Sequence, residues 1–220
     1  MSEIDIVAEA YRHCEQLVRT QDKDRFLAAL FAPAGRRPYL FALYAFALEI
    51  ARVKTLVREP MTGVIRLQWW LEALNGLRAQ EAAASPVMIA LNDAARQTGV
   101  TLAPLTAAVE ARQDELRGEP AINAAAAVFS MAARFLGVAE DVTAAAAAAA
   151  QAVTFVERDA GRARNTYCGF LALLPSIPER ALPAFLSVAL VPLRLRKPDA
   201  PQWRRQIVLA RAAWFGFSQL

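Results

Sequence analysis

The sequence is poor in the side chains that build most metal and redox sites. It has one histidine, His13, and two cysteines, Cys14 and Cys168, among 220 residues. These numbers exclude a multi-histidine metal site, a disulfide framework and a cysteine-rich zinc site. The glycine-rich dinucleotide loop, the phosphate-binding loop, the H-E-x-x-H motif and the G-x-S-x-G motif are also missing. The sequence therefore gives no support for the common classes of cofactor-binding or hydrolytic enzyme.

Long hydrophobic runs are absent as well. The longest uncharged stretch, Val142–Val156, is shorter than the roughly 18 apolar residues that mark a membrane-spanning helix. The start of the chain is acidic and resembles neither a signal peptide nor an arginine-rich transit peptide. We therefore expect a bacterial protein of the cytoplasm, either soluble or peripheral at the inner face of the membrane.

Charge of one sign does not dominate the chain. The 25 basic residues, of which only three are lysine, are offset by 21 acidic residues, for a net charge of +4. The arginines are interleaved with the acids, except near the C-terminus. This pattern is typical of solvated helix faces, so we expect no nucleic-acid partner.

Apolar and helix-forming residues are abundant. The chain is 56% hydrophobic, and about one residue in five is alanine, which favours helices. No alternating strand pattern of useful length occurs. We predict an all-α, single-domain bundle of about 9–11 helices over residues 1–196. Residues 197–220 are then a linker and a C-terminal amphipathic helix that packs on the domain or extends it.

Capping residues, prolines and glycines indicate where the helices begin and end. Ser2 and Asp5 predict a capping box at the first helix, and Pro60 predicts the start of another. The predicted helices cover residues 2–20, 22–31, 36–57, 61 onward, 86–97, 102–117, 121–136, 141–159 and a last segment around 203–217. We expect the helix over 36–57 to be central and the helix over 141–159, with its tract of seven alanines, to pack near it.

Three stretches of the chain carry motifs. Pro33 precedes Arg37 by four positions and a Tyr-Ala-Phe run follows at residues 44–46, as in the squalene/phytoene synthase family, which these stretches resemble. The stretch over residues 110–116, which ends in Asp-Glu-Leu, is similar to the acidic end of a family helix. The sequence Arg-Asp-Ala-Gly-Arg-Ala at residues 158–163 is similar to the family's second aspartate motif, Arg-Asp-Val-Gly-Glu-Asp. The resemblance covers most of residues 7–175. It implies the isoprenoid synthase fold and a cavity for which Arg37, Tyr44, Phe46, Gln68 and Trp69 are candidate lining residues.

The departures from the family pattern bear on function. The family binds Mg²⁺, and through it the substrate diphosphates, with two aspartate clusters. The three aspartate positions of the first cluster read Ala51, Arg52 and Thr55 here. The resemblance therefore implies a degenerate first motif at Glu49, Ala51, Arg52 and Thr55, and a degenerate second motif at Arg158, Asp159, Arg162 and Ala163.

Charge decides how the first motif is interpreted. An arginine about 4 Å from a divalent cation costs several kcal/mol even at an effective dielectric constant near 20. We therefore expect no catalytic residue, no metal and no cofactor. Glu49 and Arg52, spaced i and i+3, are expected to form a buried or half-buried ion pair in the old cavity.

Glu49-x-x-Arg52 followed by Arg-Leu-Gln-Trp-Trp at residues 66–70 is similar to one branch of the family, the mitochondrial complex I assembly factors. The resemblance implies action by binding a protein partner, a membrane surface or an isoprenoid-like lipid. The alternative is a Mg²⁺-dependent head-to-head prenyltransferase with an altered diphosphate site, and chance similarity to an unrelated helical adaptor is a third.

The last predicted helix has the composition of a contact element. Trp203, Ile207, Ala210, Trp214 and Phe217 fall at helical spacing. Arginines flank this stripe, and the candidate membrane or partner contacts are Trp203, Arg204, Arg205, Arg211 and Trp214. Basic charge beside an aromatic stripe is typical of helices at an anionic membrane or in a partner's groove. The competing expectation, slightly favoured for the stripe itself, is that it packs on the protein's own bundle.

Overall fold

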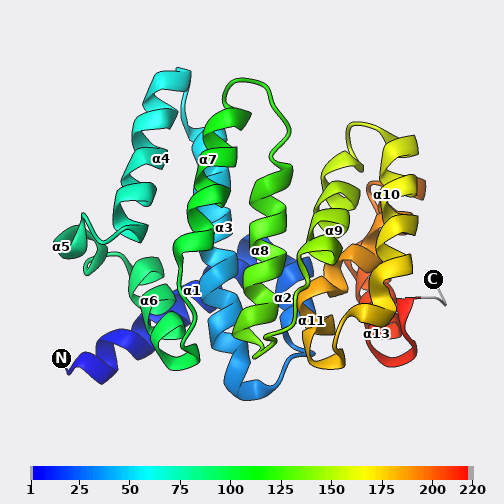
Figure 1. Ribbon diagram of the computed structural model, residues 1–220, viewed down its shortest axis with the longest axis horizontal. Helices are drawn as coiled ribbons and strands as arrows, with labels where there is room; N and C mark the ends of the chain where they lie inside the picture. The colour runs from blue at the N-terminus through cyan, green and yellow to red at the C-terminus, as the bar shows by residue number, and fades with distance from the viewer. Residues whose placement is uncertain (1, 218–220) are drawn as a thin grey trace.

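Helices make up the whole regular structure of residues 2–217, the part of the chain that the computed structural model describes (Figure 1). No strand occurs among these residues, as the sequence predicts. The α-helices are α1 Glu3–Gln21, α2 Lys23–Ala29, α3 Arg37–Leu56, α4 Pro60–Leu74, α5 Ala79–Ala82, α6 Pro86–Thr98, α7 Thr106–Glu115, α8 Ile122–Phe135, α9 Thr143–Phe155, α10 Ala160–Leu173, α11 Leu182–Phe185, α12 Val191–Arg196 and α13 Gln202–Phe215.

The predicted helix ends are confirmed where a local signal defines them. Ser2 caps α1 in a capping box: its hydroxyl accepts from the backbone N–H of Asp5 at 3.2 Å, and the Asp5 carboxylate accepts from the backbone N–H of Ser2 at 3.0 Å. Pro60 opens α4. Gly99 and Gly137 follow α6 and α8 with φ of 67° and 84°, a left-handed conformation that other residues adopt at a cost.

The predicted 9–11 helices correspond to the longer helices of the bundle. The described residues form thirteen α-helices, of which ten have at least seven residues. The other three, α5, α11 and α12, are only four to six residues long. Prolines between residues 175 and 192 break the chain into such single turns, because proline lacks the N–H that would continue a helix. The α10 helix was not delineated from the sequence.

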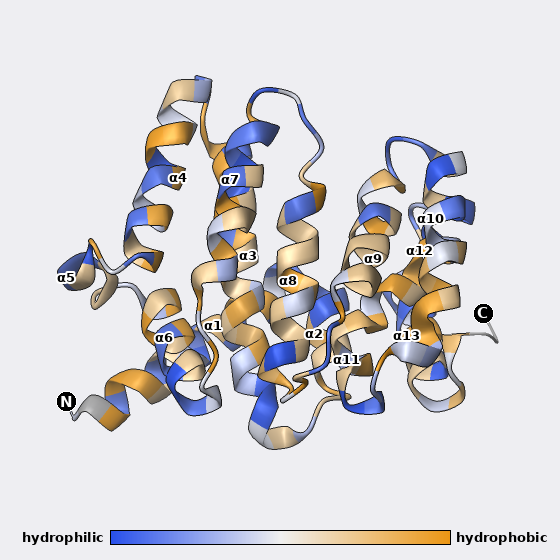
Figure 2. Cartoon of the chain, in the orientation of Figure 1, coloured by the Kyte–Doolittle hydropathy of each residue, from blue (hydrophilic) through white to orange (hydrophobic). Residues whose placement is uncertain are grey.

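The α3 helix is the centre of the bundle, as predicted. Ten of its residues are buried, and it packs against α1, α6, α8, α4 and α7. Figure 1 shows it running through the bundle behind α7 and α8. The hydropathy colouring in Figure 2 shows its surroundings as largely apolar. The residues that follow the Tyr-Ala-Phe run are therefore held on a helix fixed from several sides.

The alanine tract lies in the α9 helix. Its buried alanines, which include Ala145, Ala146, Ala149 and Ala150, have at most 3% of their surface exposed, and α9 packs closely against α8 and α10. Methyl side chains allow helix axes to approach closely, which accounts for the tract. The segment lies near α3, as predicted, and α8 packs against both α3 and α9 between them (Figure 1).

Candidate functional site

Glu49 and Arg52 form an ion pair near the C-terminal end of α3. Arg52 Nη1 lies 2.8 Å from Glu49 Oε1, and the two side chains are 40% and 30% exposed, respectively. Thr55 Oγ1 donates a hydrogen bond to the backbone carbonyl of Arg52 at 2.9 Å. Ala51 contributes only a methyl group. This face of α3 therefore presents a half-buried ion pair, as the spacing predicts, and no second carboxylate beside Glu49.

Asp159 caps the N-terminus of α10. Its Oδ1 accepts a hydrogen bond from the backbone N–H of Arg162 at 2.9 Å. The Arg162 guanidinium lies over the Phe155 ring at 4.1 Å from its centroid, and Ala163 is fully buried. The exposed neighbour Arg158 makes no ion pair among residues 2–217. Asp159 thus has a local structural role that needs no metal.

The two degenerate motifs lie at the same end of the bundle but are separated by α8. Figure 1 places the C-terminal end of α3 and the turn between α9 and α10 at this end. Between them, α8 packs against both α3 and α9. The helix order therefore keeps the two motifs at one end of the molecule, with α8 between the helices that carry them.

Three of the cavity candidates are held by internal contacts. Arg37 Nε donates to the backbone carbonyl of Ala32 at 2.9 Å. Tyr44 is 3% exposed, and burial raises its pKa to about 12. Phe46 is fully buried and meets Trp70 edge to face at a centroid distance of 5.4 Å. Tyr44 and Phe46 therefore belong to the core around α3, whereas Arg37 is half-buried at the start of that helix.

Gln68 and Trp69 point elsewhere. Trp69 Nε1 donates to Glu81 Oε2 at 2.7 Å, and Gln68 Nε2 donates to Glu72 Oε1 at 3.2 Å. Arg78 links these two carboxylates through further ion pairs. Both candidates therefore belong to a polar network between α4 and α5, and the structure does not bring them together with Tyr44. The neighbouring Trp70, by contrast, belongs to the core and is 8% exposed.

Comparison with known proteins resolves the family. The family model described as squalene/phytoene synthase matches residues 18–153. The chain belongs to the squalene/phytoene synthase family. It is 32% identical over 105 residues to the Bos taurus "NADH dehydrogenase (ubiquinone) complex I, assembly factor 6", and 33% identical over 104 residues to the Homo sapiens protein of that name.

These matches have limited extent. They cover 48% and 47% of this chain, but only 32% and 31% of the two assembly factors, so about a third of each relative is matched. The fold is shared more widely: a crystal structure of a dehydrosqualene synthase in complex with ligand superposes with a TM-score of 0.77. That match covers 97% of this chain and 99% of the other, at 14% sequence identity. The isoprenoid synthase fold predicted from the family resemblance is thereby confirmed.

The donor set at the two motifs is small. Magnesium ions that hold substrate diphosphates need several carboxylate oxygens. The first motif offers Glu49, already paired with Arg52, and the second offers Asp159, already used as a helix cap. No group of three or more His, Cys, Asp or Glu that could hold a metal occurs among residues 2–217. The residues present do not fit the family's magnesium ions.

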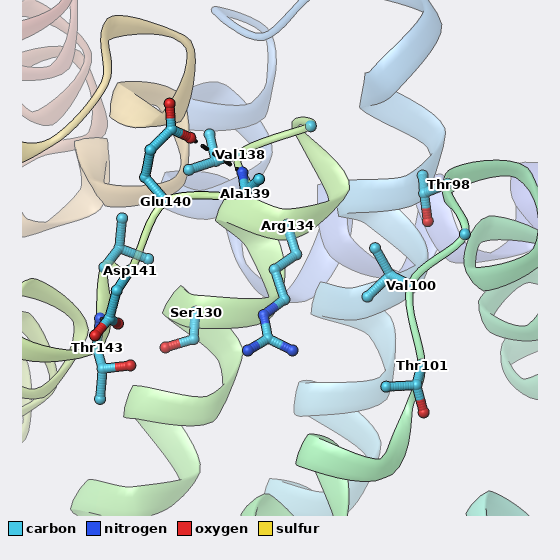
Figure 3. Close-up of a pocket in the computed structure, with 13 residues that line it drawn as sticks. Thr98, Val100, Thr101, Ser130, Arg134, Val138, Ala139, Glu140, Asp141 and Thr143 are labelled. Atoms are coloured by element: carbon cyan, nitrogen blue, oxygen red, sulfur yellow. Dashed lines mark hydrogen bonds between the residues drawn. The ribbon is translucent and has the colours of Figure 1, made fainter.

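A polar pocket at the opposite end of α8 was not predicted from the sequence. It has a volume of about 530 Å³ and lies between the α6–α7 loop and the α8–α9 loop. Figure 3 shows the Arg134 guanidinium pointing into it near Ser130. The pKa of Asp141 is below its usual value because Thr143 donates hydrogen bonds to it and Arg134 adds positive charge. The glycines that end α6 and α8 indicated both loops, but no local signal indicated that they meet.

The aromatic stripe of α13 faces solvent. Trp203, Ile207 and Trp214 are 55%, 50% and 73% exposed. The expectation that this stripe packs on the bundle is wrong, because α13 has a second apolar side. Leu209 and Ala212 are the residues it buries against the turn over residues 186–190 and against α2.

Phe217 and Arg205, two residues predicted for the exposed contact surface of α13, make internal contacts instead. Phe217 does not belong to the exposed stripe: it is 5% exposed and meets Phe170 at a centroid distance of 5.5 Å. Arg205 is a partner of the buried Asp24, whose Oδ2 accepts from Arg205 Nη1 at 2.8 Å. Arg205 is therefore corrected from a contact candidate to a structural residue. Arg204 stays on the outer surface, with its guanidinium 5.1 Å from the Trp203 ring centroid.

No helix among residues 2–217 combines the length and apolar character that crossing a membrane requires.

Proposed function

We propose that this chain is a non-catalytic member of the squalene/phytoene synthase family that acts by binding, in the manner of a respiratory complex assembly factor. The observation that carries the proposal is the Glu49–Arg52 ion pair, because the sequence resemblance aligns Arg52 with a position of the family's first aspartate cluster. A fixed guanidinium repels a divalent cation, and Glu49 is neutralised by it. The capping role of Asp159 accounts for the one motif acid that is kept.

A protein partner is the binding target that the relatives support. Both assembly factors named above are described by their role in assembling complex I. The surface offered to a partner is the outer stripe of α13, defined by Trp203, Ile207 and Trp214. Exposed tryptophans beside an arginine are typical of the residues that dominate binding energy at protein interfaces. We therefore propose this outer stripe as the partner contact.

The activity test uses farnesyl diphosphate and Mg²⁺ with the purified chain. We expect no squalene-type or phytoene-type product, and no Mg²⁺-dependent rise in melting temperature with farnesyl diphosphate. Asp159→Ser is the matched variant, because serine caps a helix but is a poor magnesium ligand. Condensation by the wild-type chain that Asp159→Ser abolishes would establish the prenyltransferase alternative instead. Stabilisation by the diphosphate without Mg²⁺ would establish an isoprenoid carrier.

The contact test uses Trp203→Ala and Trp214→Ala together. We expect this double variant to keep its fold, because both side chains are more than half exposed, and to lose co-purification with a respiratory-complex intermediate. Leu56→Ala, another exposed apolar residue, is the control. Retained co-purification by the double variant contradicts the assignment.

The sequence also left open a peripheral protein at an anionic membrane, and the same surface allows a direct test. Membrane attachment through α13 predicts flotation with anionic vesicles at low salt and loss of flotation at high salt. The appropriate charge variant is Arg204→Glu alone, since changing Arg205 would break the pair with Asp24. Salt-sensitive flotation that Arg204→Glu removes would favour the membrane over a protein partner.

A further inference from the structure

A pocket between α10 and α12 combines positive charge with an apolar floor. Its volume is about 340 Å³, at the low end of the range for ligand pockets. The two helices lie against each other, at the right of the view in Figure 2. Arg164 from α10 and Arg196 from the end of α12 both line it, and Leu171, Pro192, Leu195 and Phe217 supply its apolar part.

The two arginines of this pocket have no ionic partner among residues 2–217. Other arginines of this part of the chain are paired: Arg194 and Arg205 with Asp24, and Arg180 with Glu140. Arg164 and Arg196 are exposed and make no ion pair or hydrogen bond with the described residues. Residues 181–220 carry six basic residues and one acidic residue, and the Asp24 carboxylate offsets part of this positive charge. The unpaired Arg164 and Arg196 therefore favour an anion in the pocket.

A buried hydroxyl in the wall of the pocket lacks a partner. Tyr167 is 8% exposed, and its hydroxyl is buried without a hydrogen bond to any described residue. Burial raises its pKa to about 12, and the neighbouring Cys168 thiol adds to that effect. Buried polar groups without partners are rare in folded proteins. A polar atom of a bound molecule would supply the missing partner.

We propose that this pocket binds an anionic amphiphile, with a phosphate-type or carboxylate head between Arg164 and Arg196 and an apolar chain over Leu195 and Phe217. Guanidinium groups match such heads in charge and geometry. The small volume admits the head and the first part of the chain only. The remainder would lie along the surface.

This site differs from the region of the degenerate motifs. The α10 helix turns its buried residues Ala163 and Phe170 inward, and α10 packs against α9 on one side and α12 on another. Arg164 and Leu171 lie on the α12 side, together with Pro192. The inference therefore goes beyond the proposed function and does not depend on it.

Cys168 supplies a reporter, because it lines the pocket and is exposed. Cys14 is an internal control: it is fully buried, and burial raises its pKa to about 12, so it stays unlabelled while the chain is folded. The experiment measures the rate of maleimide labelling at each cysteine by mass spectrometry. The probe is dodecyl phosphate below its micelle concentration, compared with inorganic phosphate and with dodecyl maltoside, which has the same chain and no charge.

We expect dodecyl phosphate to slow Cys168 labelling by a factor of 1 + [L]/Kd, about ten-fold at nine times Kd. Phosphate and dodecyl maltoside at the same concentration should leave the rate within about two-fold of the free protein. Arg164→Gln combined with Arg196→Gln should abolish the protection. The matched control, Arg66→Gln combined with Arg158→Gln, changes two exposed arginines outside this pocket and should retain it.

Three results would overturn the proposal. Equal protection by dodecyl maltoside would mean a neutral apolar groove, and equal protection by inorganic phosphate would mean a site for soluble anions. Full protection in the Arg164→Gln, Arg196→Gln variant would place the probe elsewhere. Unlabelled Cys14 in every sample verifies that a variant is folded, so a loss of protection is not attributed to unfolding.

Discussion

Asp24 ties the C-terminal helices to the N-terminal part of the chain. Its side chain is 5% exposed, and Oδ2 accepts from Arg194 Nη2 at 2.9 Å and from Arg205 Nη1 at 2.8 Å. Asp24 lies on α2, Arg194 on α12 and Arg205 on α13. Asp24→Ala therefore removes the anion that both arginines share, although they come from different helices.

The stability that Asp24→Ala loses depends on how strongly Arg194 and Arg205 need a carboxylate partner. Removing one partner of a fully buried pair costs about 3–5 kcal/mol, because the other charge is left uncompensated. Arg194 and Arg205 are 38% and 29% exposed, so water screens part of that penalty. We expect a loss of about 2–3 kcal/mol in unfolding free energy, which for a chain of this size lowers the melting temperature by roughly 4–12 °C.

The assay is urea unfolding of Asp24→Ala, Arg205→Gln and the double variant. Because the two residues share one contact, the double variant should lose less stability than the sum of the single variants, by about 1 kcal/mol or more. Hydrogen exchange should rise in α13 first, since α13 is held by few other elements. A loss below about 0.5 kcal/mol for Asp24→Ala, or additive effects in the cycle, would refute this reasoning.

Three further predictions concern other parts of the fold. Burial acts to raise the pKa of Asp93, but hydrogen bonds from Arg96, Tyr11 and Gln97 outweigh it and lower the pKa. Its contribution to stability is therefore present above the unfolded pKa of about 3.9 and is lost as pH falls through the lower folded value. Urea unfolding at pH 7 and pH 3 should show a smaller pH effect for Asp93→Asn, and parallel profiles would contradict this. Ala146→Leu should destabilise the chain by about 1–3 kcal/mol through overpacking at a fully buried position of α9, whereas Ala144→Leu, at an exposed position, should change little. Asp159→Ala should lower the unfolding free energy by about 1 kcal/mol and Asp159→Ser by much less, and equal losses would remove the capping role.

The sequence by itself determined the fold class, the family resemblance and most helix ends. Each of these depends on neighbours along the chain. Ser2 and Asp5 are three residues apart and bond to each other's backbone, and Pro60 acts on its own turn. The Glu49–Arg52 pair was predictable for the same reason, because residues three apart share one helix face. Local spacing was enough in these cases.

Only the tertiary structure decided which side of each helix faces the core. The α13 helix has apolar residues on two sides, and the contact of Leu209 and Ala212 with the 186–190 turn leaves Trp203 and Trp214 in solvent. Arg205 donates to Asp24, 181 residues earlier in the chain. Trp69, predicted to line a cavity with Tyr44, donates to Glu81 instead. The pocket of Arg164 and Arg196 exists only because α12 packs on α10. Such contacts join distant segments whose meeting is set by the packing of the whole core, and no local pattern records them.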